Sequence, residues 1–146
     1  LNKQPLFQEY FDVFPIIVQH NRIEPRGQMK DRSIILSPHI PTLEEMTKVT
    51  IHEIAHAFDI YIFQKDLFQT DLSNKFYTIS WESAKTSVSD SSISDFVSGY
   101  AASNQYEDFA ESFTFYVFHQ DEFKKRAQNS GKLQKKYTFL KNYIFK

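Results

Sequence analysis

Two histidines and a glutamate in the first half of the chain have the spacing of a metal site. The stretch TIHEIAHAFD, residues 50–59, places His52 and His56 four residues apart, with Glu53 next to the first. Side chains four residues apart share one face of an α-helix, so both imidazoles can reach one ion. Glu53 is turned by about 100° from His52, which keeps it out of the ligand plane and within reach of a nearby water. The motif predicts two zinc ligands and a general base, and the alternative is a surface helix with solvated histidines.

The third zinc ligand must come from outside this helix. One large class of zinc enzymes completes the pattern HExxHxxGxxH, but this chain has Asp59 and Ile62 at the last two positions. The stretch NQYEDFAESF, residues 104–113, offers Glu107 and Glu111, which are again four residues apart on one helical face. A second helix therefore presents carboxylates that could complete the site.

The roles of two acidic residues, Glu107 and Asp59, remain open at this stage. Asn104 with Glu107 three residues later matches a capping box, in which Glu107 would only secure the start of a helix. Asp59 lies three residues after His56 and could hold the second N–H of a ligand histidine, as outer-shell groups usually do. It could equally be an ordinary solvated helix residue. The spacing alone leaves both questions open.

The motif HEIAHAFD, followed by YAASNQYEDFAESF at residues 100–113, resembles the catalytic domain of anthrax lethal factor. It is also similar to the clostridial Pro-Pro endopeptidases, which share that type of domain. Both are gluzincins, with HExxH on one helix and a glutamate from a later helix as third ligand. The resemblance runs from about residue 33 to the C-terminus. Residues 1–146 contain no glycine-rich segment before the HExxH helix like that of the Pro-Pro enzymes and no counterpart of the additional domains of the toxin.

The resemblance implies a role for each matching residue. Glu107 would join the two histidines as the third zinc ligand, and Glu53 would be the general base. Tyr100 would stabilise the oxyanion, and Glu111 would lie near the metal as an outer-shell group. The implied activity is that of a zinc metalloendopeptidase, in which a zinc-activated water attacks the peptide bond and Glu53 carries the proton.

The elements that must position these residues indicate an α+β fold that is mainly helical. We expect a zincin-like domain, with a small sheet beside the HExxH helix and a helical C-terminal part. Thr42 and Glu45 match a capping box at the start of the HExxH helix, while Asp71 and Asn104 can cap later helices. The expected strands cover residues 16–19 and 33–37, and the expected helices cover 5–14, 42–64, 72–81, 104–119 and a segment after Ser130–Gly131.

Two segments are expected to border the substrate. The strand at 33–37 lies a few residues before the HExxH helix, so we expect its edge to face the cleft and to pair with an extended protein or peptide substrate. The serine-rich stretch 83–98 reads as a long surface loop that leads into Tyr100 and closes over the substrate. An open groove of this kind predicts an endopeptidase rather than an enzyme that trims chain ends.

Composition places the chain among globular proteins and predicts one domain over residues 1–146. It has 41% hydrophobic residues, 17 basic against 18 acidic residues, and no cysteine. These values exclude thiolate zinc sites and give no general reason to expect nucleic-acid binding. No apolar run is long enough for a membrane span. We expect a monomer that is secreted after loss of an export signal, with a cytoplasmic location as the alternative.

Two other classes of function compete with the protease. One is a catalytically silent zinc-binding or toxin-derived binding module with the same fold, against which the presence of Glu53 and Tyr100 argues. The other is a nucleic-acid or membrane-surface binder that uses the basic residues near the C-terminus, which are better explained as a solvated helical face. These residues are Lys124, Lys125, Arg126, Lys132, Lys135 and Lys136. The substrate and the cleavage-site preference do not follow from the sequence.

Overall fold

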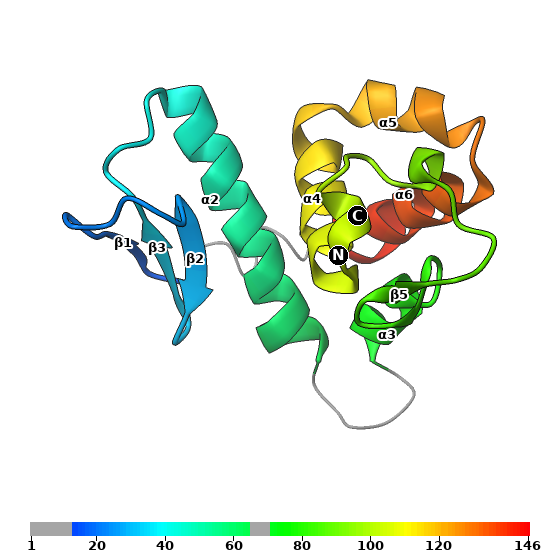
Figure 1. Ribbon diagram of the computed structural model, residues 1–146, viewed down its shortest axis with the longest axis horizontal. Helices are drawn as coiled ribbons and strands as arrows, with labels where there is room; N and C mark the ends of the chain where they lie inside the picture. Colours follow the sequence, from blue (N-terminus) through cyan, green and yellow to red (C-terminus); the bar gives the residue numbers. More distant parts are fainter. Residues whose placement is uncertain (1–12, 65–70) are drawn as a thin grey trace, which may run out of the picture.

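The helix that carries the HExxH motif, α2 (Leu43–Ala57), lies in the middle of the fold. The computed structural model describes residues 13–64 and 71–146, and in it a small sheet lies on one side of α2 and the C-terminal helices lie on the other (Figure 1). The fold is α+β with helix predominating, as the sequence predicts. The helix predicted over residues 5–14 lies outside the described residues, apart from its last two positions.

The sheet beside α2 has three strands rather than the two that the sequence predicts. Its order is β1 (Ile16–Val18), β3 (Ser33–Leu36), β2 (Gly27–Lys30). β1 pairs with β3 in parallel, and β2 pairs with β3 antiparallel through a tight turn at Asp31 and Arg32, both with positive φ. The sequence GQMK of β2 has only four residues, one apolar side chain and no β-branched residue, so its pattern is too weak to predict a strand.

The position of β3 corrects the predicted substrate-binding edge. Because β3 is paired on both sides, the strand predicted at residues 33–37 has no free edge. Within the described part of the chain, the outer strands of this sheet are β1 and β2. β2 packs against α2, so β2 rather than β3 offers an edge next to the HExxH helix.

The start of α2 is capped by Thr42, as predicted, but its end differs from the prediction. The Thr42 hydroxyl accepts the backbone N–H of Glu45 at 3.1 Å, which is half of the predicted capping box. The carboxylate of Glu45 pairs with Arg26 instead of the helix start. The predicted helix over 42–64 is α-helical only to Ala57, and a π-helix, η2 (Phe58–Phe63), completes it.

The C-terminal part consists of short elements followed by three packed helices. Their bounds are α3 (Leu72–Tyr77), β4 (Trp81–Ser83), β5 (Thr86–Ser87), η3 (Ile93–Asp95), η4 (Ala101–Ser103), α4 (Gln105–Phe118), α5 (Gln120–Ala127) and α6 (Gly131–Tyr143). The predicted caps Asp71 and Asn104 both accept backbone N–H groups at the starts of α3 and α4. α3 ends at Tyr77, short of the predicted end at residue 81, because Trp81 begins a strand.

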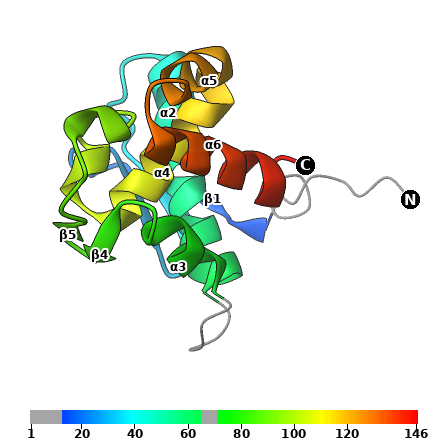
Figure 2. The same ribbon diagram turned by 90° about the vertical axis from the view of Figure 1, so that its right-hand side faces the viewer.

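Aromatic rings fill the space between α2 and the C-terminal helices. α4 runs antiparallel to α2, and α6 packs on α4 and α5 (Figures 1 and 2). The rings of Phe76 and Phe109 meet edge to face at 5.1 Å, and both side chains are fully buried. This pair joins α4 to α3, and α4 also packs directly along α2. α2 and α4 are the two helices that carry the predicted ligands.

The serine-rich stretch 83–98 is more structured than the predicted surface loop. It contains the end of the β4–β5 hairpin and η3, and its last part is tied to α5 and α6. Lys136 Nζ donates to the carbonyl oxygen of Asp95 at 2.9 Å. The Arg126 guanidinium donates to the carbonyl oxygens of Phe96 and Val97 at 2.8 and 2.9 Å. These bonds argue against the predicted closing movement, because they hold the end that leads to Tyr100.

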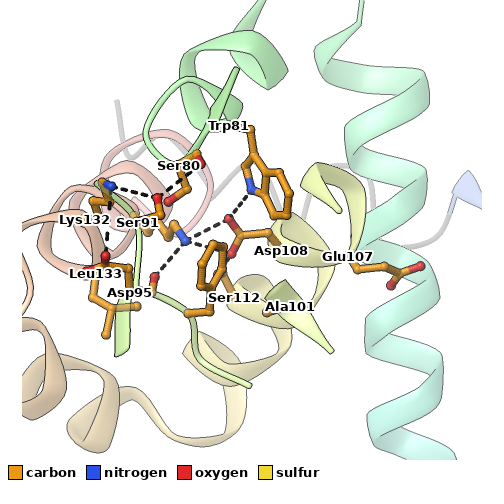
Figure 3. Close-up of polar contacts among 12 residues, drawn as sticks. Ser80, Trp81, Ser91, Asp95, Ala101, Glu107, Asp108, Ser112, Lys132 and Leu133 are labelled. Atoms are coloured by element: carbon orange, nitrogen blue, oxygen red, sulfur yellow. Dashed lines mark hydrogen bonds and ion pairs between the residues drawn. The ribbon is translucent and has the colours of Figure 1, made fainter. Parts of the chain in front are cut away.

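A buried ion pair lies behind this segment. Lys136 and Asp108 are both fully buried, and Lys136 Nζ lies 2.9 Å from one carboxylate oxygen of Asp108 and 2.8 Å from the other. Trp81 Nε1 also donates to Asp108, at 2.9 Å (Figure 3). The pair joins α4 to α6 in the interior.

Candidate metal centre

Three side chains from α2 and α4 bring their donor atoms to one point. His52 Nε2 lies 3.1 Å from Glu107 Oε2 and 3.2 Å from His56 Nε2. The third edge, from His56 Nε2 to Glu107 Oε2, is 3.4 Å. Among residues 13–64 and 71–146, this is the group of His, Asp and Glu side chains whose geometry could hold a metal ion. The sequence predicted these three residues as ligands, and the fold brings them together.

The size of this triangle fits zinc. Zinc bonds imidazole nitrogen and carboxylate oxygen at about 2.0–2.2 Å with tetrahedral geometry, which sets neighbouring ligand atoms about 3.3 Å apart. The observed edges of 3.1, 3.2 and 3.4 Å lie close to that value. Two imidazoles and one carboxylate also form a three-ligand set of the kind that leaves a fourth position open in catalytic zinc sites. The residues present therefore fit a catalytic zinc ion.

The start of α4 aims Glu107 at α2. Asn104 Oδ1 accepts the backbone N–H groups of Tyr106 and Glu107, each at 3.0 Å, and so fixes the first turn. The carboxylate of Glu107 does not close a capping box, because it reaches across to His52. Figure 3 shows Glu107 directed toward α2, while the next residue, Asp108, points the other way into the buried network. Because adjacent residues of a helix are turned by about 100°, Glu107 faces the metal site and Asp108 faces the core.

The electrostatics of the cluster favour positive charge at its centre. Burial opposes a charge on His52, but the carboxylates of Glu107 and Glu111 outweigh it and raise the pKa of His52 to about 9. Burial likewise opposes the charge on Glu107, and here His52 and His56 outweigh it and hold the pKa of Glu107 well below its usual range. A divalent cation supplies the positive charge that this arrangement stabilises.

Glu111 contacts the far side of His52. Glu111 Oε1 lies 3.0 Å from His52 Nδ1, one helical turn from Glu107, and so can fix the orientation and tautomer of the ring. Its other oxygen accepts a hydrogen bond from Ser98 Oγ at 2.6 Å. The sequence analysis missed Ser98, because one serine within a serine-rich stretch carries no distinguishing signal.

Glu53 lies on the sheet side of α2, where it is 7% exposed. Burial raises the pKa of its carboxyl, while His56, His52 and the backbone amide of Met29 act in the opposite direction. Gly27 of β2 lies directly against it, since a Cβ on Gly27 would come within 2.8 Å of Glu53 Oε1. Gly27 is a second residue that the sequence analysis missed, although a lone glycine in a strand can mark such a close approach.

Tyr100 lies at the rim of the cluster, in the turn before η4. Its side chain is 57% exposed, and its ring stacks on His52 with centroids 6.1 Å apart. Burial of the hydroxyl and the carboxylate of Glu107 raise the pKa of Tyr100 to about 12, so the hydroxyl keeps its proton at neutral pH. The fold thus places the Tyr100 ring beside His52, and its role as oxyanion donor stays a prediction.

Asp59 differs from its prediction. It is fully buried at the start of η2, and its carboxylate accepts hydrogen bonds from Ser73, at 2.5 Å, and from Tyr77. Burial raises the pKa of Asp59 to about 6, and these two donors oppose the rise. Its hydrogen bonds therefore tie α3 to the end of the HExxH helix. The contact with a ligand histidine, one of the two roles that the spacing left open, is not among them. His56 influences Asp59 through its charge.

A cavity adjoins the cluster between α2 and α4. Its volume is about 270 Å³, and its walls include His52 and Glu111. The apolar part of the wall comes from Val49, Phe115 and Phe118. A larger cavity of about 390 Å³ lies between α3 and α6, lined by residues that are not part of the cluster.

The sequence matches a protein family described as "Putative zinc-binding metallo-peptidase" over residues 29–146. The match covers most of the chain and includes all three candidate ligands, so the chain belongs to this family of metallopeptidases. No curated protein and no solved structure matches the chain. Family and geometry agree on the cofactor, which is zinc.

Several of the basic residues near the C-terminus are engaged within the fold. Lys136 is buried with Asp108, Arg126 binds backbone carbonyls, and Lys132 Nζ lies 2.7 Å from Asp90. These three basic side chains are therefore part of the packed fold. Within the described part of the chain, no helix has the length and apolar character needed to cross a membrane.

Proposed function

We propose that the protein is a zinc-dependent endopeptidase of the gluzincin type, with residues 1–146 forming one catalytic domain. The observation that carries the proposal is the triangle of His52, His56 and Glu107, with edges of 3.1–3.4 Å, beside the buried Glu53. The order of the motifs along the chain supports it, because it resembles that of lethal factor and the Pro-Pro endopeptidases.

The residues around the triangle have complementary tasks in hydrolysis. A zinc ion held by His52, His56 and Glu107 would supply Lewis acidity, which would polarise a peptide carbonyl and lower the pKa of a water to about 7. Glu53 takes a proton from the attacking water and delivers it to the leaving amine. The Tyr100 hydroxyl donates a hydrogen bond to the oxyanion that develops on the carbonyl. Glu111 keeps the His52 ring in place. The reaction needs no covalent nucleophile.

We further propose that an extended substrate pairs with β2. β2 has a single sheet neighbour among the described residues and contacts Glu53 through Gly27, so a peptide added at its outer edge would pass beside the catalytic residues. Backbone pairing of this kind holds a chain on both sides of the cleaved bond. The substrate is therefore an internal segment of a protein or peptide rather than a free terminus.

The cavity between α2 and α4 suits a substrate side chain next to the cleaved bond. It is larger than a dry apolar cavity of about 150 Å³ that is known to hold benzene, since its volume is about 270 Å³. Val49, Phe115 and Phe118 form an apolar wall that suits a large apolar side chain, while Lys48 and His119 line the same cavity and can meet a polar group at its end.

The test is a cleavage assay on zinc-loaded protein with internally quenched peptides, compared with amino-acid amides that have free termini. We expect cleavage of the peptides alone. Glu53→Gln should keep one zinc per chain and lose turnover, because Glu53 lies beside the ligand set and is not part of it. If the wild-type protein holds zinc but cleaves neither substrate class, the chain is a silent zinc-binding module. Release of terminal residues alone would instead refute the open groove.

A further inference from the structure

The hydroxyl of Ser98 connects two parts of the candidate active site. It donates to Glu111 Oε2 at 2.6 Å, and Glu111 Oε1 lies 3.0 Å from His52 Nδ1. Ser98 Oγ also accepts the backbone N–H of Ala101 at 3.0 Å, and this bond closes the turn that carries Tyr100. One atom thus contacts both the carboxylate that orients a zinc ligand and the backbone that positions the oxyanion donor.

The backbone that carries Ser98 is itself held in place. The three preceding carbonyl oxygens, from Asp95, Phe96 and Val97, accept hydrogen bonds from Lys136 and Arg126 at 2.8–2.9 Å. The side chains of Phe96 and Val97 are buried, so apolar packing adds to these bonds. Ser98 therefore lies in a backbone segment that hydrogen bonds and apolar packing hold in place.

We propose that Ser98 is a positioning residue that couples His52, through Glu111, to the turn that carries Tyr100. A carboxylate with one oxygen on the His52 ring and the other on a fixed hydroxyl has a single orientation. Without the hydroxyl, Glu111 can rotate away from His52, and the N–H of Ala101 loses its acceptor. The part of this inference that concerns Tyr100 rests on the proposed peptidase function, whereas the part that concerns His52 rests on zinc binding alone.

Substitution of Ser98 by alanine tests both parts. Replacing the partner of a ligand histidine commonly costs 10–100-fold in metal affinity or activity. Ser98 acts one contact further out, so we expect Ser98→Ala to raise the Kd for zinc about tenfold, at the lower end of that range. We also expect a fall in kcat with little change in KM, because Tyr100 acts on the transition state. Ser98→Thr keeps the hydroxyl and should restore most of both quantities.

Ser89→Ala is the matched control. Ser89 lies in the same serine-rich stretch and is exposed, outside the contacts described above. It should leave the Kd for zinc, kcat and the unfolding midpoint unchanged. If Ser98→Ala weakens zinc binding and lowers kcat more than Ser89→Ala does, while both variants unfold at the same midpoint, the effect belongs to the site.

A spectroscopic measurement follows the coupling without turnover. In zinc-loaded protein, the ring ¹⁵N resonances of His52 report the hydrogen bond at Nδ1, and Ser98→Ala should shift them while Ser89→Ala does not. Adding Ser98→Ala to a Glu111→Gln variant should change the Kd for zinc little further, because both act on His52 along one path.

The outcomes separate this inference from the proposed function. The coupling is refuted if Ser98→Ala matches Ser89→Ala in zinc affinity and in the His52 resonances, whatever the activity. If the wild-type protein binds zinc but cleaves no peptide, the proposed function fails, and these two measurements still decide the coupling to His52. If zinc affinity and resonances respond but kcat does not, the link to Tyr100 is refuted and the link to His52 stands.

Discussion

Glu107 and Glu111 lie one turn apart on α4 and touch different atoms of the same histidine. Glu107 Oε2 lies 3.1 Å from His52 Nε2, and Glu111 Oε1 lies 3.0 Å from His52 Nδ1. Both carboxylates are partly buried, and their spacing in the sequence is that of an ordinary helical pair. At the scale of single residues, the atom contacted rather than the residue type distinguishes a ligand from a supporting group.

The first prediction concerns these two glutamates. Glu107→Ala should reduce bound zinc to well below one equivalent per chain, because it removes one of three ligand atoms. Glu111→Ala should retain zinc with an affinity lowered about 10–100-fold, the usual effect of losing an outer-shell partner. Metal analysis after dialysis against a weak chelator measures both. The opposite order of the two losses would show that Glu111 is the ligand.

The second prediction concerns the hydroxyl of Tyr100. Tyr100→Phe should retain zinc and fold stability while kcat falls by about 10²–10³-fold, the effect of removing one oxyanion donor. Tyr106→Phe is a matched control, since Tyr106 is also a partly exposed tyrosine in this region but packs on Tyr77, at 5.6 Å. Steady-state kinetics on one quenched peptide would compare them. Equal rates for the two variants would rule out Tyr100 as the donor.

At the scale of elements, β2 and α2 approach so closely at Gly27 that there is no room for a larger side chain. A Cβ on Gly27 would lie 2.5 Å from Val49 Cγ1 and 2.8 Å from Glu53 Oε1. Relief of these contacts would require the Val49 side chain to shift and the Glu53 carboxylate, which is 7% exposed, to be displaced. The strand and the catalytic helix are therefore joined at a position that only glycine fits.

The third prediction follows from this contact. Gly27→Ala should lower the free energy of unfolding by about 1–3 kcal/mol, as overpacked cores do, and should reduce kcat through displacement of Glu53. Gly131→Ala is the control, because nothing lies within 4 Å of a Cβ at Gly131, at the start of α6. Urea unfolding and peptide cleavage measure the two effects. A Gly27→Ala variant with wild-type kcat would mean that Glu53 does not depend on β2.

The fourth prediction compares the two cavities. Thr114 on α4 lines the cavity beside His52, whereas Thr138 on α6 lines the larger one. Thr114→Trp should fill the first cavity and change which side chain is preferred next to the cleaved bond, away from large apolar residues. Thr138→Trp is the same substitution and should leave the preference unchanged. Cleavage of a peptide library by both variants is the measurement, and an identical profile would exclude this cavity from substrate binding.

At the scale of the whole molecule, the buried pair of Lys136 and Asp108 connects the C-terminal helix to the helix of Glu107. Burial raises the pKa of Asp108 and lowers the pKa of Lys136, and each partner opposes the shift of the other. The Lys136 ammonium also lies 4.2 Å from the centre of the Phe96 ring. Removal of one charge would leave the other buried without its partner.

The fifth prediction tests this pair. Lys136→Met should destabilise the fold by about 3–5 kcal/mol, the usual cost of an unpaired buried charge. The double variant with Asp108→Asn should recover much of that loss, because the amide oxygen can still accept from Trp81. Lys135→Met, at an exposed neighbouring position, serves as the control in urea unfolding. Equal midpoints for Lys136→Met and Lys135→Met would mean that the pair contributes little.

The sequence by itself determined the features that depend on local spacing. The positions of His52 and His56 follow from helical periodicity, and the caps at Thr42, Asp71 and Asn104 follow from the chemistry of helix starts. The helical content could be predicted for the same reason, whereas Glu107 as third ligand was a prediction from the family resemblance. Local patterns were sufficient to predict these local features because the geometry of one helical turn fixes the distances between residues three or four apart.

Tertiary structure decided what depends on contacts between distant segments. The sequence gives no sign that β3 is central rather than at an edge, because pairing depends on where β2 returns after its turn. Nor does it show that Asp59 turns to Ser73 and Tyr77, or that Ser98 meets Glu111. Lys136 reads as a surface charge in the sequence and lies fully buried in the fold. The role of a polar side chain depends on the group that it contacts, and the packing of whole elements determines which group lies within reach.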